Sequence, residues 1–230
     1  MRRIRRGALL IAAGAVVAVT PAGVPALAGT RPPAVQPAPE KAEAVCTAPF
    51  VENDPRLGPV NLPETGLLGR ILRGYAQLGG LSGYQFIDRY WDLTTNSYRF
   101  PPDDGFAHAG GFPNAKPVLE GYNLEAGTEV DRFGGEGGAF LSPVGTPYSQ
   151  RAIPPSNLDT FAPQYPCNYH VYRVARSFAV DVGPIAPAFQ QPGGGRQYHL
   201  LSKYFVDAPK GRREASVAFL VEQGYLQRLN

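Results

Sequence analysis

The stretch "TEVDRFGGEGGAFLSP" (Thr128–Pro143) holds two short runs with the composition of β-strands, one on each side of a glycine cluster. Runs rich in β-branched and aromatic residues and bounded by Gly or Pro are typical of strands. Two further candidates follow in "NYHVYRVARSFAV" (Asn168–Val180) and "RQYHLL" (Arg196–Leu201). With few helices between them, these runs predict an α+β domain built on a strongly bent, mainly antiparallel sheet.

Two segments outside these strand candidates have helical patterning. Apolar residues recur at helical spacing over residues 67–78, with Pro and Glu in front and glycines behind, which predicts one amphipathic helix. Near the end of the chain, "REASVAFLVEQGYLQRL" (Arg213–Leu229) predicts a second helix that stops at Gly224. The aromatic-rich block "YQFIDRYWDLTTNSYRF" (Tyr84–Phe100) is predicted to be a loop with a short strand.

Changes in composition divide the chain into four parts. Residues 1–28 combine an arginine-rich start, an apolar run and a small-x-small ending, which predicts a secretory signal peptide and an extracellular protein. The Pro- and Ala-rich residues 29–45 are predicted to be a disordered spacer. Residues 46–99 are expected to form a helical accessory lobe and residues 100–230 the main domain. No later apolar run reaches membrane-spanning length.

The formal charge of +3 belongs to the first residues. Residues 1–28 hold four of the 22 Lys and Arg and none of the 19 Asp and Glu, which leaves 18 basic against 19 acidic residues. A nearly neutral chain has no general field that attracts nucleic acid or an anionic membrane, so neither is an expected partner. We therefore expect any anion to be bound by a local cluster of side chains.

Cys46 and Cys167 are the only two cysteines. An even count in an exported protein predicts one disulfide. This bond would join the start of the mature chain to the middle of the main domain. For a loop of about 120 residues, the chain-entropy account of disulfides gives a stabilisation of at most about 4–5 kcal/mol.

Several common kinds of active site do not fit the pattern. No Cys/His cluster has metal-ligand spacing, and the histidines at positions 108, 170 and 199 are scattered, so no metal site is expected. No GxSxG motif offers a nucleophilic serine. The glycine clusters at residues 134–138 and 193–195 lack the spacing of nucleotide-binding fingerprints.

Arginines beside flexible backbone are the remaining candidates for ligand binding. Arg132 is followed by Phe133 and Gly134, and glycine lets a ligand approach the backbone closely. Because a guanidinium suits a bidentate phosphate contact, Arg132 and Arg151 with an aromatic face would fit a diphosphate ligand that carries a flat cationic ring. The candidate aromatic faces are Phe133, Phe140 and Tyr198. The residues alone fit equally well with a solvated Asp131–Arg132 charge pair and with rings that belong to the core.

Longer motifs make the chain recognisable. They are "RFPPDDGFA" (99–107), "GTEVDRFGGEGGAFLSPVGTPYSQRAIPPSNL" (127–158), "YHVYRV" (169–174), "VGPIAPAFQQPGGGRQYHL" (182–200) and "LVEQGYL" (220–226). In this order and spacing they strongly resemble the TNT (tuberculosis necrotizing toxin) domain family, from about residue 100 to the end. The parts "DRFGG", "RAIPPSNL" and "GPIAPAFQQPGGGRQY" together make the resemblance specific.

The resemblance implies a NAD⁺ glycohydrolase, which hydrolyses the bond between nicotinamide and ribose and releases nicotinamide and ADP-ribose. NAD⁺ is then the substrate, and no resident cofactor is expected. The implied fold has a curved antiparallel sheet and is distantly similar to ADP-ribosylating toxins. Toxin action and a neutralising immunity protein are further expectations. Fungal relatives bind calcium, but Glu222 is the one acidic residue in the matching C-terminal stretch, so no calcium site is expected.

The motifs also imply roles for individual residues. Arg132 and Gln197 match the principal catalytic pair, and His170 in "YHVY" matches a catalytic histidine. Phe140 and Arg151 match substrate-contacting positions. The expected substrate-binding set is therefore Phe133, Gly134, Phe140, Arg151 and Tyr198. In contrast, Arg196 and His199 are expected to be structural or rim residues.

The implied reaction suits these residue types. Nicotinamide leaves a cationic ring as a neutral molecule, and the amide of Gln197 can orient a ribose hydroxyl or the attacking water. Glycosidases use a carboxylate pair for comparable chemistry, and no such pair is apparent in the sequence. Two other functions stay open: an ADP-ribosyltransferase, for which no glutamate candidate is apparent, and a non-catalytic binding module at the cell surface.

Overall fold

The computed structural model describes residues 45–230. The predicted signal peptide and all but the last residue of the predicted spacer lie outside the described residues. Within this range, residues 46–99 pack against the sheet formed by later residues, and the described chain belongs to one compact unit. None of its helices has the length and apolar character needed to cross a membrane.

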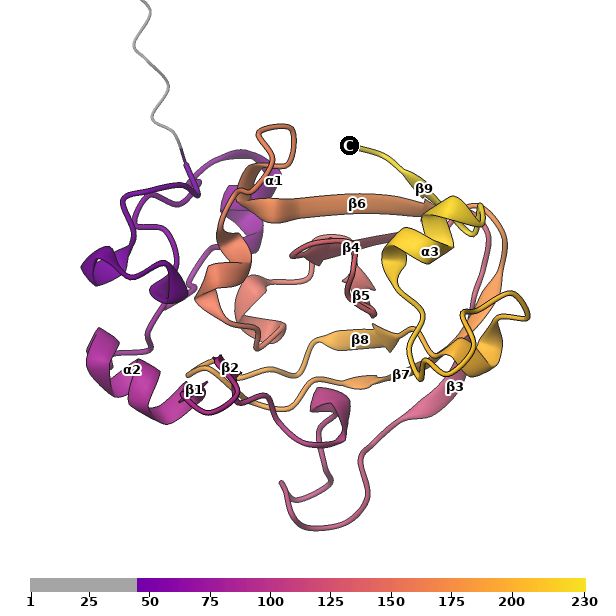
Figure 1. Ribbon diagram of the computed structural model, residues 1–230, viewed down its shortest axis with the longest axis horizontal. Coiled ribbons are helices and arrows are strands. Elements are labelled where there is room, and N and C mark those ends of the chain that lie inside the picture. Colours follow the sequence, from indigo (N-terminus) through magenta and orange to yellow (C-terminus); the bar gives the residue numbers. More distant parts are fainter. Residues whose placement is uncertain (1–44) are drawn as a thin grey trace, which may run out of the picture. The chain divides into compact units, whose positions relative to one another are not determined.

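The described chain is organised around a seven-stranded sheet with strand order β3-β7-β8-β5-β4-β6-β9 (Figure 1). Every neighbouring pair in this sheet is antiparallel. Its strands are β3 (Glu120–Leu124), β4 (Glu129–Phe133), β5 (Phe140–Pro143), β6 (Tyr169–Val174), β7 (Phe178–Pro184), β8 (Arg196–His199) and β9 (Leu226–Arg228). A separate hairpin consists of β1 (Trp91–Asp92) and β2 (Ser97–Tyr98). The predicted α+β class with a mainly antiparallel sheet is confirmed.

Helices are short throughout the described chain. The α-helices are α1 (Gly66–Ile71), α2 (Gly83–Tyr90) and α3 (Val217–Glu222). The 3₁₀ helices are η1 (Val51–Asn53), η2 (Pro55–Leu57), η3 (Asp103–Gly105), η4 (Tyr148–Gln150), η5 (Pro155–Leu158), η6 (Pro166–Asn168) and η7 (Ser202–Tyr204). Figure 1 shows α1 beside one end of β6 and α3 beside its other end.

Three predicted strands are confirmed, and a fourth is divided. The runs at 128–133, 138–143 and 196–201 contain β4, β5 and β8. The run at 168–180 forms two strands, β6 and β7, which have no neighbour in common in the sheet. The chain turns between them at residues 175–177, where the amide of Ala175 donates to the carbonyl oxygen of Tyr225.

Two predictions for residues 46–99 need correction. The helix expected over 67–78 ends at Ile71, because the chain turns and Gly74 adopts a φ of +73°. The block 84–100, predicted as loop and short strand, begins with α2 and continues into the β1–β2 hairpin. A capping box starts α2: Ser82 Oγ accepts from the Gln85 amide, and Gln85 Oε1 accepts from the Ser82 amide. This reciprocal pair satisfies two backbone donors at the start of the helix. It is a helix signal in the sequence, but the aromatic composition of the block favoured a loop and strand instead.

Separate clusters of buried side chains pack against the sheet. The larger cluster joins Val130, Tyr172 and Tyr198 of the strands to Leu220 of α3. A second cluster packs α1 against Phe133 and Tyr169 and includes Cys46 and Cys167. The predicted disulfide is confirmed: these two cysteines are bonded, with 121 residues of sequence separation. It attaches the segment before α1 to the start of β6.

The sheet is weakly joined in the middle. β4 and β5 share only two register pairs, Val130↔Pro143 and Asp131↔Ser142. Arg132, the next residue of β4, has its partner in β6, where it lies opposite His170. β5 instead continues with β8, where Phe140 lies opposite His199. A gap therefore opens between β4 and β5 at Arg132 and Phe140.

Candidate functional site

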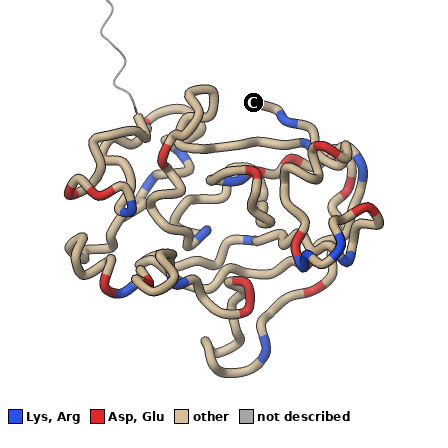
Figure 2. The backbone as a smooth tube through the Cα atoms, viewed as in Figure 1, with Lys and Arg blue, Asp and Glu red and all other residues tan. Residues whose placement is uncertain are grey.

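A cavity of about 420 Å³ lies at this gap. Five predicted site residues line it: Arg132, Phe133, Phe140, Arg151 and Gln197. The cavity is also lined by three carboxylate residues, Asp104, Asp131 and Glu214, and by Asn157. Elsewhere Lys and Arg are interspersed with Asp and Glu along the described chain (Figure 2). The cavity therefore brings together charged groups from distant parts of the sequence.

Arg132 is held by backbone carbonyl groups. Its Nε donates to the carbonyl oxygen of Gly134 at 2.9 Å, and its Nη1 donates to the carbonyl oxygen of Phe140 at 2.9 Å. These two acceptors fix the guanidinium across the gap between the strands. The side chain is half-buried.

The charge of Arg132 has no carboxylate partner. None of the ion pairs among residues 45–230 includes it. Burial lowers the pKa of its guanidinium, and Tyr172 and Glu136 oppose this effect. A charge withdrawn from water without a partner is costly, and an anion in the cavity would remove that cost. Arg132 is thus suited to bind a phosphate or carboxylate group of a ligand.

The glycine cluster after β4 makes room for this guanidinium. A Cβ on Gly138 would lie 2.4 Å from Arg132 Nη2, and one on Gly134 would lie 2.9 Å from Asn157 Nδ2. Gly134 also has a φ of +102°, which favours glycine. Positions 135 and 137, in contrast, face open space. Two of the four glycines in "GGEGG" therefore serve the placement of Arg132 directly.

Arg151 differs from Arg132 because its charge is already balanced. Its Nη1 lies 2.7 Å from Asp131 Oδ1, its Nη2 donates to Asp131 Oδ2 at 2.9 Å, and both side chains are buried. Its Nε donates to the Thr146 carbonyl oxygen. The guanidinium also lies over the Phe133 ring, 5.1 Å from its centre. Asp131 therefore pairs with Arg151 in the interior, and not with Arg132 in solvent.

Gln197 projects from β8 into the same cavity and is buried. Its Nε2 donates to the backbone carbonyl oxygen of Asp104 at 2.9 Å. No hydrogen bond among the described residues engages its Oε1. The amide is thus oriented by the backbone at η3, and its oxygen can accept a hydrogen bond from a ligand or a water.

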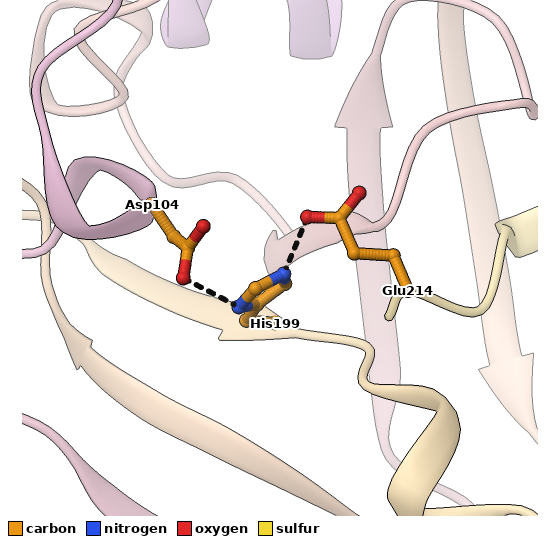
Figure 3. A group of neighbouring side chains, drawn as sticks. All are labelled: Asp104, His199 and Glu214. Carbon is orange, nitrogen blue, oxygen red and sulfur yellow. Dashed lines mark hydrogen bonds and ion pairs between the residues drawn. The ribbon is translucent and has the colours of Figure 1, made fainter. Parts of the chain in front are cut away.

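His199 follows Gln197 by two residues on β8, so both side chains lie on one face of the strand. Figure 3 shows its ring between the carboxylates of Asp104 and Glu214. Nε2 lies 2.8 Å from Glu214 Oε1, and Nδ1 lies 3.6 Å from Asp104 Oδ2. The Phe140 ring stacks on the imidazole at 4.5 Å between centres. The sequence prediction of a structural or rim role missed this cluster.

Arg213 completes the cluster of Asp104, His199 and Glu214. It forms a two-point ion pair with Asp104, and this pair lowers the pKa of the Asp104 carboxyl against the opposing effect of burial. The three clustered side chains offer atoms that could ligate a cation, all within 4.8 Å of one another. However, the two ring nitrogens face different carboxylates, and Arg213 occupies one carboxylate. The arrangement is that of an ion-paired network.

Three predicted site residues do not line the cavity. His170 is buried and lies opposite Arg132 in the register of β4 and β6, with Nε2 3.1 Å from Asn168 Oδ1. Burial lowers its pKa, an effect that Glu136 opposes and Arg132 assists. Tyr198 faces the larger core and stacks on Tyr122. Gly134 contributes its carbonyl oxygen to Arg132. Their roles in catalysis or substrate binding stay predictions.

Comparisons with known proteins place this chain. The tuberculosis necrotizing toxin family matches residues 123–229. The conidial surface nicotinamide adenine dinucleotide glycohydrolase nadA of Aspergillus fumigatus is 43% identical over 183 residues, which cover 79% of this chain and 71% of that protein.

Among solved structures, tuberculosis necrotizing toxin complexed with its immunity factor IFT matches with a TM-score of 0.46 and 22% identity, over 64% of this chain and 71% of that chain. Rhs1-CT in complex with its cognate immunity protein RhsI1 matches with a TM-score of 0.29 and 14% identity, over 52% of this chain and 83% of that chain. The identity and coverage shared with the fungal protein, together with the family match, show that the chain belongs to the tuberculosis necrotizing toxin family.

Proposed function

We propose that the protein is a NAD⁺ glycohydrolase, which hydrolyses the bond between nicotinamide and ribose. The fungal relative is named as an enzyme of this kind. The observation that carries the proposal is the unpaired guanidinium of Arg132, which lines one cavity with the oriented amide of Gln197. In this proposal NAD⁺ is the substrate, and the protein needs no resident cofactor.

The cavity supplies the elements that this reaction requires. Arg132 would pair with the diphosphate of NAD⁺ and anchor it in the gap between β4 and β5. Gln197 Oε1 would accept a hydrogen bond from a hydroxyl of the nicotinamide ribose or from the attacking water. Holding these groups in a reactive geometry contributes several kcal/mol to catalysis, about 7–11 in the best-oriented cases. The neutral leaving group needs no acid to depart.

An assay of NAD⁺ consumption by the purified protein, without any added acceptor, tests the proposal. We expect nicotinamide and free ADP-ribose in equal amounts. Arg132→Ala should lower kcat/KM by about 10²-fold, since a charge-assisted contact to the substrate is lost. Gln197→Ala should lower it by about 10-fold or more. Arg173→Ala and Gln227→Ala are matched controls, because both residues are exposed on β6 and β9. A wild-type protein that leaves NAD⁺ intact contradicts the proposal.

The same assay separates the alternatives. An ADP-ribosyltransferase would release nicotinamide but attach ADP-ribose to a target protein, so free ADP-ribose would fall short of nicotinamide. A non-catalytic binding module would bind NAD⁺ without releasing nicotinamide. The unpaired Arg132 favours an anionic ligand in all three cases, and family membership favours hydrolysis.

We further propose export to the cell exterior, because residues 1–28 have signal-peptide patterning and the fungal relative is described as a conidial surface protein. N-terminal sequencing of protein from the culture medium should start near residue 29. Toxin action and an immunity protein are proposed on family membership alone. Expression of residues 29–230 in a bacterial strain with an oxidising cytoplasm, in which the Cys46–Cys167 disulfide can form, should deplete NAD⁺ and arrest growth, whereas the Arg132→Ala variant should not.

A further inference from the structure

Glu214 lies on the cavity wall on a segment that is fixed to the end of β8. The amide of Ser202 donates to the Arg213 carbonyl oxygen at 2.9 Å, and the amide of Ala215 donates to the Leu200 carbonyl oxygen at 3.0 Å. Leu201 and Glu214 form an antiparallel bridge between these bonds. The backbone on both sides of Glu214 is therefore anchored to the strand that carries Gln197.

The carboxylate of Glu214 has one oxygen engaged and one available. Oε1 lies 2.8 Å from His199 Nε2, whereas no hydrogen bond among the described residues engages Oε2. The His199 ring is 1% exposed and is held by the stacked ring of Phe140. Because the imidazole cannot move freely, it fixes the direction of the carboxylate at the cavity wall.

Asp104 connects this carboxylate to Gln197. Its backbone carbonyl oxygen accepts from Gln197 Nε2, and its side chain lies against the far side of the His199 ring. Asp104 has a φ of +57°, which is uncommon for a residue other than glycine. This backbone conformation lets one residue orient the Gln197 amide with its main chain and the His199 imidazole with its side chain.

The charges in the cavity match those of a dinucleotide whose diphosphate is anionic and whose nicotinamide ribose is cationic in the transition state. Arg132 supplies a cation that has no carboxylate partner within residues 45–230. Glu214 supplies an anion on a different segment, beside His199 and with Arg213 Nη1 3.9 Å from Oε1. An anion beside a developing positive charge stabilises that charge.

We propose that Glu214 is a catalytic carboxylate of this cavity, and that His199 and Asp104 are residues that position it; this rests on the proposed NAD⁺ hydrolysis. The C1′–N bond breaks, and its electron pair returns to the nicotinamide ring, which leaves as a neutral molecule. A water oxygen forms the new bond to C1′, and its proton passes to Glu214 and then to solvent. The products are nicotinamide, ADP-ribose and one proton.

Glu214→Gln tests this role, since it removes the charge and keeps the shape. We expect kcat to fall by about 10²-fold or more, the range of a lost general base, while KM changes by less than about threefold. Glu129→Gln is the matched control, because Glu129 has similar side-chain exposure, 45% against 41%, and an ion pair of 2.9 Å with Arg173.

The outcomes separate this inference from the proposed function. If the wild type hydrolyses NAD⁺ and Glu214→Gln is as active as Glu129→Gln, the role of Glu214 is overturned and the hydrolase proposal stands. If the wild type leaves NAD⁺ intact, both are overturned. Thermal melting of both variants should match the wild type, and NAD⁺ binding by Glu214→Gln should be retained, which assigns the loss to chemistry.

Two substitutions at His199 test the positioning. His199→Gln keeps an N–H donor toward Glu214, whereas His199→Phe keeps a flat ring against Phe140 and removes the donor. We expect the Phe variant to lose about tenfold in kcat with little change in KM, and the Gln variant to retain most of the activity. A purely structural role for the ring predicts the reverse order and would overturn the positioning role.

Discussion

Arg132 Nη1 donates to the Phe140 carbonyl oxygen at 2.9 Å across the gap between β4 and β5, and the backbone at Gly138 lies against the other side of the same guanidinium. A Cβ at position 138 would lie 2.4 Å from Arg132 Nη2, closer than non-bonded atoms can approach. The place of this arginine therefore depends on a residue six positions further along the chain having no side chain.

The Gly138→Ala substitution should displace the Arg132 guanidinium from the Phe140 carbonyl group. We expect kcat/KM for NAD⁺ to fall by about tenfold or more, because a shift of about 1 Å in an anchoring group is costly. Gly137→Ala is the control, since a Cβ there meets nothing within 4 Å. Equal activity of the two variants would show that the position of Arg132 does not matter to the reaction.

Loss of Arg151 should lower the free energy of unfolding strongly, although the residue lines the cavity. Arg151→Met leaves the buried Asp131 carboxylate without its partner, and removing one side of a buried ion pair costs about 3–5 kcal/mol. Urea denaturation of this variant should therefore show a much lower midpoint. Arg173→Met breaks an exposed pair and should cost at most about 1 kcal/mol. A small loss in Arg151→Met would instead indicate that water reaches Asp131.

The sequence predicted the central strands because their composition and their glycine and proline boundaries agree. β3 escaped prediction because four of its five residues are exposed, so no alternating apolar pattern marks it. The helix over 67–78 was too long in the prediction because its apolar residues divide between two clusters: Leu72 and Tyr75 pack with α1, whereas Leu78 packs with α2. Periodicity records which residues are buried and does not record where the chain turns.

Cavity residues that lie within a recognisable motif could be predicted from the sequence. Residues that reach the cavity only because distant segments fold together could not. Arg132 and Gln197 were found through their motifs, and the structure places both at one cavity. The sequence did not indicate that Glu214 lines this cavity, because a carboxylate in a charged loop carries no signal until the chain folds back onto β8. His199 was expected to be a structural or rim residue, and this expectation stays a prediction; its spacing of two from Gln197 on a strand places both side chains on one face.

Reduction of the disulfide should lower the free energy of unfolding. The effect can be assigned to this one bond, because no free cysteine is present among the described residues. The bond between Cys46 and Cys167 closes a loop with a sequence separation of 121, for which the chain-entropy account gives up to about 4–5 kcal/mol. Urea denaturation with and without dithiothreitol should show this loss. The double Cys46→Ser, Cys167→Ser variant should have the reduced midpoint and no response to the reductant. A change of the urea midpoint with dithiothreitol in that variant would show that the reductant does not act through this disulfide.

Asp159 should make stability decrease as pH rises. Its side chain is buried, Oδ1 has no hydrogen-bond partner among residues 45–230, and burial raises its pKa from 3.8 to about 7. A raised pKa means that the folded protein binds this proton more tightly than the unfolded chain does. Its contribution to stability is therefore largest below about pH 4 and is lost as the pH rises toward 7.

Asp159→Asn removes this titration, so the variant should exceed the wild type in free energy of unfolding at pH 8 by about 1–3 kcal/mol, the cost of a buried polar group without a partner. The difference should shrink as the pH falls to 4. Other carboxyl groups, such as Asp104 with its lowered pKa, give the opposite slope, so only the difference between variant and wild type isolates Asp159. The exposed Asp88→Asn is the control. A difference that stays constant between pH 4 and pH 8 would show that Asp159 ionises in the folded protein as it does in the unfolded chain.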